Sequence, residues 1–269
     1  MHILEQKVRQ AMAEDRYAVI PFLTAGYPDE ETFWKAIADM DQHGADIIEV
    51  GVPFSDPVAD GPVIEAASRQ VLADGTSLAG ILENFKLRRD FLKASIVLMG
   101  YFNPFMQYGW EKLAKDMKDA GISGIIIPDL PFEEAGPYRE IMKAQGIALI
   151  ALVGPNTSEE RMQLYADVSE GYAYVISVLG TTGERESVAP MVATTLRRAK
   201  SVFKQPIAMG FGLSHPEQLD VLPEDAQPDA VVFGSALVKH LAEGNDAISF
   251  CSAGKATMQD AGTARVHKK

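Results

Sequence analysis

The sequence predicts an α/β protein, and it favours a closed (β/α)8 barrel with extra N-terminal and C-terminal helices. Short runs rich in Ile, Val and Leu alternate with charged segments of helical length, and eight such pairs fit into the 269 residues. The first predicted strand is followed by Thr24-Ala25-Gly26-Tyr27-Pro28, which lacks the glycine pattern of a dinucleotide-binding turn. Glycines follow the last two predicted strands, where barrels often bind phosphate. An open doubly wound sheet is the alternative.

The predicted strands are short aliphatic runs, as expected for parallel strands that are covered on both faces. In chain order they are Ala18–Thr24, Asp46–Val52, Ser95–Tyr101, Gly124–Pro128, Ala148–Val153, Tyr172–Ser177, Pro206–Gly210 and Ala230–Gly234.

The predicted helices are the charged, amphipathic segments between these strands. Asp29 and Ser158 stand where N-caps belong, and Gly44, Gly121 and Gly146 follow helical segments as left-handed caps would. The predicted helices are Ile3–Glu14, Glu30–His43, Ser77–Leu92, Trp110–Ala120, Glu133–Gln145, Glu159–Glu170, Ala189–Phe203, Ala236–Glu243 and Asp246–Asp260.

Composition excludes several classes of protein. The chain has 25 Lys and Arg against 37 Asp and Glu, so its net charge is 25 − 37 = −12, which argues against binding to nucleic acid. No segment reaches the roughly 18 consecutive apolar residues of a membrane span, and charged residues near the start argue against a signal peptide. The single cysteine, Cys251, cannot form an internal disulfide. We therefore expect one cytoplasmic domain that covers residues 1–269.

Glu49 is an acidic residue inside the second predicted strand. Strand alternation places the β-branched Ile48 and Val50 on one face and Glu49 with Gly51 on the other. Because the β-branched face suits packing against outer helices, Glu49 is expected to point into the barrel. Loss of solvation would raise its pKa toward the range that is useful for proton transfer. The alternative is a structural Glu paired with a Lys or Arg elsewhere in the chain.

The loop after this strand holds a second candidate, Asp60. Pro53, Pro57 and Pro62 limit the conformations of the loop, which suggests more than a simple connection. Asp60 could reach over the barrel mouth toward Glu49, giving two carboxylates with different environments and roles. However, Asp60 stands before Gly61 and could equally be an ordinary turn residue.

Three glycine clusters follow the last predicted strands. Gly180–Gly183 follows strand six, Gly210–Ser214 follows strand seven, and Gly234-Ser235 ends strand eight and precedes a helix. Glycine turns are common, so each cluster alone is a weak signal. Together they favour an anion site made from backbone N–H groups and a helix N-terminus. The histidines show no spacing typical of metal ligands, and we expect no metal site.

Several motifs, taken together, are similar to those of the tryptophan synthase alpha subunit. The most specific is the run from Ile48 to Pro62, which reads IEVGVPFSDPVADGP. Matching stretches follow the same order over roughly Leu4 to Gly244. They are Pro21–Pro28, Tyr101–Pro104, Pro128–Pro131, Gly180–Gly183, Gly210–Ser214 and Gly234–Ala236.

The resemblance implies a TIM barrel that cleaves indole-3-glycerol phosphate to indole and glyceraldehyde 3-phosphate by a retro-aldol reaction, without a metal or Schiff base. Glu49 matches the family's general acid/base, and Asp60 matches the carboxylate that stabilises the indole N–H. The substrate-binding positions that the resemblance implies are Phe22, Tyr101, Tyr174, Thr182, Gly183, Phe211, Gly212, Gly234 and Ser235.

The resemblance also implies a partner, the beta subunit, which holds pyridoxal phosphate and receives indole in an α2β2 heterotetramer. Asp56, Asn103 and Phe105 match partner-facing positions and are expected on loops at the barrel mouth. No cofactor is expected in this chain. One departure is Val178, which stands where some family members carry Arg before the flap at residues 180–183.

Three other functions remain open at this point. The chain could be a stand-alone lyase that releases free indole, or a non-catalytic subunit that activates a partner. It could also be another phosphate-binding barrel, such as a sugar-phosphate isomerase, whose substrate would lack an indole ring.

Overall fold

The computed structural model describes residues 1–176, 185–210, 219, 222–248 and 250, with the backbone alone for 185–189. The described strands form one sheet in the order β5-β4-β3-β2-β1-β9-β8-β7-β6, and every described pair is parallel. The strands are β1 Ala18–Thr24, β2 Ile47–Gly51, β3 Ser95–Met99, β4 Ile122–Ile126, β5 Ala148–Leu149, β6 Ala151–Val153, β7 Ala173–Ile176, β8 Ile207–Gly210 and β9 Ala230–Phe233.

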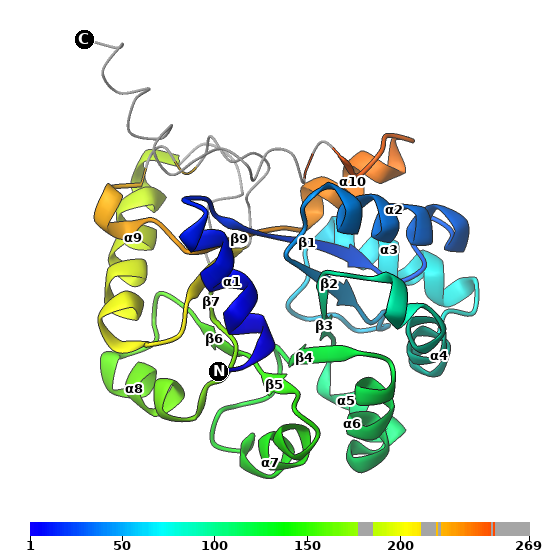
Figure 1. Cartoon of the computed structure of the whole chain (residues 1–269), viewed down its shortest axis with the longest axis horizontal. Coiled ribbons are helices and arrows are strands. Elements are labelled where there is room, and N and C mark those ends of the chain that lie inside the picture. The colour runs from blue at the N-terminus through cyan, green and yellow to red at the C-terminus, as the bar shows by residue number, and fades with distance from the viewer. Residues whose placement is uncertain (177–184, 211–218, 220–221, 249, 251–269) are drawn as a thin grey trace.

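The sheet closes into a TIM barrel. The two ends of the strand order, β5 and β6, are consecutive pieces of one strand that is interrupted only at Ile150. The fold class predicted from the sequence is thus confirmed, and the open doubly wound sheet is wrong. Helices surround the strands (Figure 1). No helix of the described chain is long and apolar enough to cross a membrane.

Ten α-helices lie in the described part of the chain. They are α1 Ile3–Ala13, α2 Glu30–His43, α3 Pro62–Ala73, α4 Leu78–Arg88, α5 Phe102–Tyr108, α6 Trp110–Asp119, α7 Gly136–Ala144, α8 Glu159–Val168, α9 Arg185–Val202 and α10 Ser235–Ala242. Short 3-10 helices follow at Arg89–Phe91 and Glu224–Ala226. The predicted caps are present: Asp29 and Ser158 accept N–H groups at the starts of α2 and α8, and Gly44 has φ +115°.

Two helices were not predicted, and both carry a proline in their first turn. Helix α3 starts with Pro62 directly after its N-cap, Gly61. Helix α5 contains Pro104 in its first turn, where a loop was expected for Asn103 and Phe105. The first N–H groups of a helix have no partner within the helix, so proline is tolerated there. The loop placement of Asn103 and Phe105 was therefore wrong.

Other helix boundaries also differ from the prediction. Helix α9 starts at Arg185 and passes through Pro190 rather than starting at Ala189, and α7 starts at Gly136 rather than Glu133. Most of the predicted helix Asp246–Asp260 lies outside the described residues.

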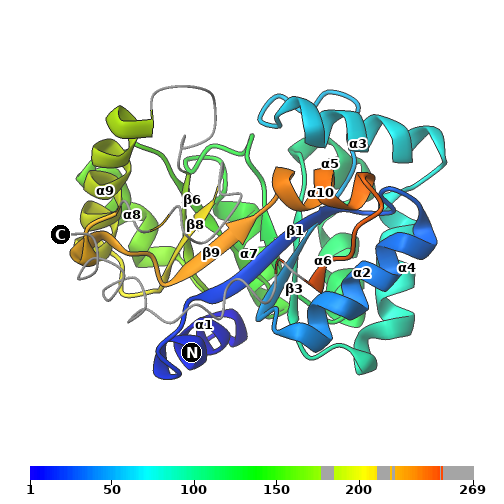
Figure 2. The same ribbon diagram turned by 90° about the horizontal axis from the view of Figure 1, so that it is seen from above.

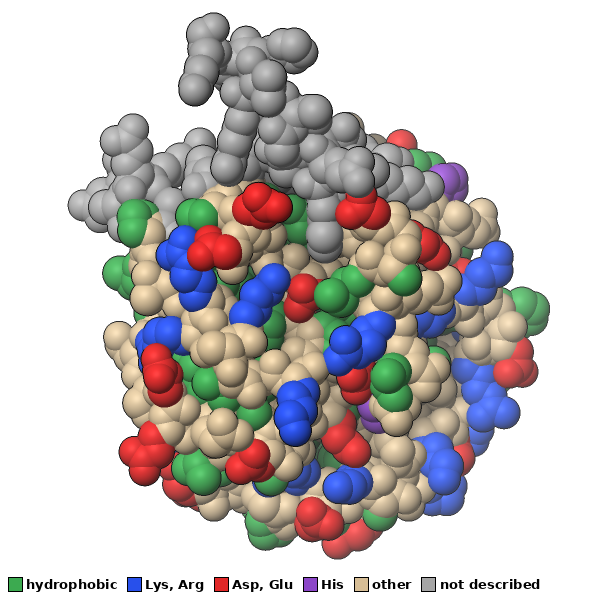
Figure 3. Space-filling view, turned by 60° about the vertical axis from the view of Figure 1, so that its left-hand side comes forward, with side chains coloured by type: hydrophobic (Ala, Val, Ile, Leu, Met, Phe, Trp, Pro, Cys, Tyr) green, Lys and Arg blue, Asp and Glu red, His purple; other side chains and the backbone are tan. Residues whose placement is uncertain are grey.

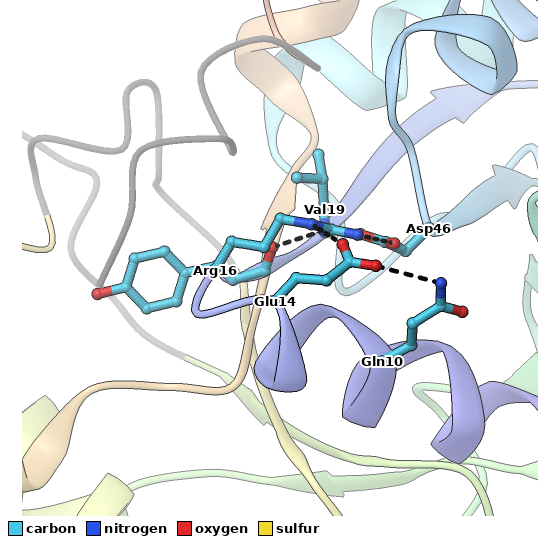
Figure 4. A network of polar contacts seen from close by, with 6 residues as sticks. Gln10, Glu14, Arg16, Val19 and Asp46 are labelled. Atoms are coloured by element: carbon cyan, nitrogen blue, oxygen red, sulfur yellow. Dashed lines mark hydrogen bonds and ion pairs between the residues drawn. The ribbon is translucent and has the colours of Figure 1, made fainter. Parts of the chain in front are cut away.

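The amino ends of the first strands are held by a partly buried polar network (Figure 4). The Arg16 guanidinium donates two hydrogen bonds to the Asp46 carboxylate, at 2.7 and 2.9 Å. Asp46 also accepts the backbone N–H of Val19 at 2.9 Å.

Helix α1 lies across the barrel in Figure 1. Its Leu4 packs closely against Gly124, where a Cβ would lie 2.7 Å from Leu4 Cδ1. Figure 2 shows α1 at one end of β1.

Surface charges of both signs are interspersed on the face shown in Figure 3. Lys and Arg side chains alternate there with Asp and Glu. Elsewhere in the described chain, several ion pairs join residues four apart on a helix, such as Lys112 with Asp116 and Lys115 with Asp119. A basic strip of the kind that binds a phosphate backbone is not seen on this face.

Candidate functional site

The strand register brings Phe22 and Glu49 to the same inner face of the barrel. Phe22 pairs with Glu49 across β1 and β2, and Glu49 pairs with Val97 across β2 and β3. Residues paired in this way in parallel strands point to the same side of the sheet. Glu49 is fully buried, at 0% exposure, and it lines a pocket inside the barrel. This is the orientation that strand alternation predicts.

The pocket lies at the carboxyl ends of the strands, where barrels place their active sites. It brings together six of the residues named from the sequence: Phe22, Glu49, Asp60, Tyr174, Gly234 and Ser235. Ile64, Met99 and Val232 complete the lining and were not predicted. Met99 and Val232 follow from strand alternation, whereas Ile64 lies on α3, which the sequence analysis missed.

The carboxyl group of Glu49 is held by a tyrosine and by no described cation. The Tyr172 hydroxyl donates a 2.8 Å hydrogen bond to Glu49 Oε1, and both side chains are buried. Oε2 has no hydrogen-bond partner in the described structure. Burial raises the pKa of Glu49 to about 8, opposed in part by the Tyr172 hydrogen bond. No ion pair between Glu49 and Lys or Arg exists among the described residues, so the structural alternative of a buried ion pair finds no support there.

Tyr172 is the functional neighbour that sequence reasoning missed. It stands immediately before β7 and two residues before Tyr174, so alternation puts both side chains on the same inner face. This spacing was a usable signal. What the sequence could not show is that the Tyr172 hydroxyl reaches Glu49, which is 123 residues away in the chain.

Asp60 is the second acid of the pocket, and it is only partly buried. Burial raises the pKa of Asp60 to about 6, a hydrogen bond with Tyr101 lowers it, and the charge of Glu65 raises it further. The Tyr101 hydroxyl also accepts the N–H of Ala59 at 3.0 Å. Tyr101 therefore positions the loop that carries Asp60, although it does not line the pocket itself.

Two glycines make room for the aromatic side chains of the pocket. A Cβ on Gly210 would lie 2.0 Å from the Tyr174 hydroxyl oxygen, and a Cβ on Gly51 would lie 2.6 Å from the Phe22 ring. Gly210 had been interpreted only as part of a phosphate-binding cluster. In the structure it is required for the position of Tyr174.

The N-terminus of α10 opens onto the pocket. Gly234 is the N-cap residue of this helix and Ser235 is its first residue, and both line the pocket. The first N–H groups of a helix have no intrahelical acceptor and carry partial positive charge, so they can bind an anion. The pocket thus combines two acids and an apolar wall with an anion-binding helix end. Thr182, Gly183, Phe211 and Gly212 lie outside the described residues.

A family model described as "Tryptophan synthase alpha chain" matches residues 8–265. The chain belongs to this family. The resemblance found in the motifs ended near Gly244, and the match shows that it continues into the C-terminal segment.

Curated relatives and solved structures agree with this assignment. The tryptophan synthase alpha chain of Desulfovibrio desulfuricans is 61% identical over 250 residues, which cover 93% of this chain and 98% of that relative. The alpha chain of Nitratidesulfovibrio vulgaris (strain DP4) is 55% identical, with 93% and 96% covered. The crystal structure of tryptophan synthase subunit alpha from Legionella pneumophila str. Paris has a TM-score of 0.83 at 30% identity and covers 97% of this chain and 98% of that one.

The residues expected to face a partner lie in different environments. Asp56 and Asn103 are exposed, Asp56 on the loop after β2 and Asn103 on α5. Phe105 is fully buried, and its ring packs 6.2 Å from the Trp110 ring between centroids. A Cβ on Gly100 would lie 2.7 Å from the Phe105 ring. Phe105 therefore anchors α5 to the barrel, and its side chain offers no surface in this chain alone.

Among the described residues, no group of three or more His, Cys, Asp or Glu side chains is arranged to hold a metal ion.

Proposed function

We propose that this chain cleaves indole-3-glycerol phosphate to indole and glyceraldehyde 3-phosphate, the alpha reaction of tryptophan biosynthesis. The observation that carries the proposal is a pair of carboxyl groups with raised and different pKa values in one pocket, Glu49 at about 8 and Asp60 at about 6. Near neutral pH the first is mainly protonated and the second mainly ionised. Two acids in opposite states allow one pocket to donate a proton and to stabilise positive charge.

Glu49 is the general acid and base. Its carboxyl group gives a proton to indole C3, which makes the ring an electron acceptor with positive charge at N1. The resulting carboxylate takes the proton of the hydroxyl on the adjacent glycerol carbon, a C=O bond forms there, and the C–C bond breaks with its electron pair returning to the ring. Glu49 ends protonated again, and no metal or Schiff base is required.

Asp60 accepts the indole N1–H. Its carboxylate stabilises the charge that protonation of C3 creates on the ring, and it contributes most when ionised. Its hydrogen bond with Tyr101 and its place just before α3 support this role, because both hold it in the pocket that Glu49 also lines.

The remaining lining residues bind the substrate. Phe22 and Tyr174 supply aromatic walls for the indole ring, and Gly234 and Ser235 supply N–H groups for the phosphate. Thr182 would close over Asp60, while Gly183, Phe211 and Gly212 would complete the phosphate site. A pocket of backbone N–H groups allows a chain of net charge −12 to bind an anion.

The proposed partner is a beta subunit that carries pyridoxal phosphate and consumes indole, in an α2β2 assembly in the cytoplasm. Asp56 and Asn103 are the exposed contacts proposed for it, and Phe105 supports α5 from beneath. The alpha chain itself uses no cofactor in this proposal.

The decisive experiment is indole release from indole-3-glycerol phosphate by the Glu49→Gln variant. We expect a loss of at least about a thousandfold in kcat, because the variant has no proton to donate, with folding and beta-subunit binding intact. Glu83→Gln, which changes an exposed carboxylate on α4, is the matched control. Turnover by Glu49→Gln at the rate of the unchanged chain would show that the assignment is wrong.

The same assay separates the alternative functions. Strong stimulation by a beta subunit supports the complex, whereas equal rates with and without it support a stand-alone lyase. If no indole is released with or without the beta subunit, and the chain only raises the activity of the beta subunit, the chain is a non-catalytic activator. Turnover of a sugar phosphate without an indole ring would indicate a different barrel enzyme.

A further inference from the structure

A second cavity lies on the outside of the barrel, between α7 and α8. Helix α7 packs against α6, and α8 packs against α9, which leaves a groove between the two helices. Figure 1 places α7 and α8 next to each other at the lower edge of the molecule. The cavity holds about 220 Å³, and its floor is residues 149–152, where the barrel strand is interrupted between β5 and β6. We call it the α7–α8 groove.

One wall of the groove is aromatic. The rings of Phe132 and Tyr165 lie 4.6 Å apart between centroids, tilted by 32°. Beside them are Ile150, which is nearly fully buried, and Val168, which is exposed at the rim. An apolar floor and a paired aromatic wall are typical of sites that take a flat, apolar ligand body.

Two arginines line the groove, and they differ in what they bind. Arg161 forms a 2.7 Å ion pair with Glu133 and donates to the Tyr165 hydroxyl. Arg139 lies over the Phe132 ring, 5.1 Å from its centre, and makes no ion pair or side-chain hydrogen bond with any described residue. Burial lowers the pKa of Arg139, opposed only by the charge of Glu140. A half-buried guanidinium without a carboxylate has lost part of its hydration, and a bound anion would replace it.

We propose that the α7–α8 groove binds a small aromatic carboxylate, with the carboxylate on the Arg139 guanidinium and the ring against Phe132 and Tyr165. A guanidinium stacked on a ring keeps its in-plane N–H donors available, and these match a planar carboxylate in a two-point contact. A dianionic phosphate fits less well, because Arg139 is the one uncompensated cation of the groove among the described residues and Glu140 adjoins it. The site is distinct from the barrel pocket, with which it shares no lining residue.

The test is a titration of the full chain with phenylacetate, followed by calorimetry and by backbone amide shifts. We expect saturable binding with shifts at residues 149–152 and none at Glu49. Arg139→Gln should weaken binding about ten- to a hundredfold, because it removes a charge-assisted contact. Arg88→Gln is the matched control, since Arg88 also lies over an aromatic ring, that of Trp34, but far from the groove. It should bind phenylacetate unchanged.

Two other ligands and one further variant test which features of the ligand and of the groove are needed for binding. Phenylacetamide, which lacks the charge, should bind at least about tenfold more weakly, and inorganic phosphate should leave residues 149–152 unshifted. Val168→Trp fills the exposed rim and should block phenylacetate even if Arg139→Gln fails to fold. Absence of binding at millimolar concentration, shifts confined to the barrel pocket, equal affinity for phenylacetamide, or undiminished binding by a folded Arg139→Gln would each overturn the proposal.

Discussion

At the scale of single residues, the contact between Tyr172 and Glu49 controls when the proposed acid holds its proton. The Tyr172 hydrogen bond stabilises the carboxylate and lowers the pKa of Glu49, against the larger effect of burial. Removing the hydroxyl with Tyr172→Phe should therefore raise that pKa further. Because Glu49 must be protonated in order to donate its proton to indole C3, kcat/KM should fall above about pH 8 in the unchanged chain. In the variant this decline should move up by roughly half to one pH unit.

The measurement is the pH profile of kcat/KM for indole release. Tyr108→Phe is the control, since its hydroxyl bonds Asp116 on the surface of α5 and α6. If the role of Tyr172 were merely structural, Tyr172→Phe would lower the rate at all pH values and leave the alkaline decline at the same pH.

Glu49 also affects stability, because the folded chain holds its proton to a higher pH than the unfolded chain does. The pKa of Glu49 is about 8 in the folded chain against an ordinary glutamate value of 4.5, so between these pH values the native state binds one proton more. Stability must then fall as pH rises through this window. Glu49→Gln does not titrate, and near pH 8 it should be more stable than the unchanged chain by roughly 2–4 kcal/mol. Near pH 4.5 the gain should vanish.

Urea unfolding of both proteins between pH 5 and 9 checks this expectation. A constant difference across the whole range would show that Glu49 is ionised in the folded chain at neutral pH. The expected result would mean that the carboxyl group is retained at a cost in stability, as is common where a side chain serves a reaction.

At the scale of elements, strands were predicted better than helices. Alternation within β2 is local, so it placed Glu49 inside the barrel without knowledge of the neighbouring strands. Helices α3 and α5 were missed because Pro62 and Pro104 were interpreted as loop residues, although proline is compatible with a first helical turn. Missing α3 also hid Ile64 from the predicted pocket.

Contacts between elements could not be predicted from local patterns. The hydrogen bond from Tyr172 to Glu49 depends on closure of the barrel, and the groove beside Arg139 depends on how far apart two helices pack. The family motifs supplied Asp60 and Tyr174 as site residues, for which spacing alone was ambiguous or silent. The structure then placed both in the pocket with Glu49.

At the scale of the whole molecule, the two ends of the barrel have different tasks. The carboxyl ends carry the pocket, with its unpaired polar atom Glu49 Oε2. The amino ends carry a hydrogen-bonded network in which Arg16, on the segment after α1, binds Asp46 at the start of β2. Separating stabilising and functional groups in this way is expected of a barrel. It predicts that damage to the amino-end network changes stability with little effect on catalysis.

Asp46→Asn tests this separation. The change removes the Asp46 charge from the Arg16 guanidinium, which is only 19% exposed and keeps Glu14 as its remaining anionic partner, so the free energy of unfolding should fall by roughly 1–2 kcal/mol. The rate of indole release below the unfolding transition should stay within about twofold. Asp119→Asn is the control, because its pair with Lys115 joins residues four apart on the solvent side of α6 and should change the free energy of unfolding little. If Asp46→Asn lowered kcat tenfold while remaining folded, the network would have to act on the pocket through β2, which carries both Glu49 and the strand start that Asp46 holds.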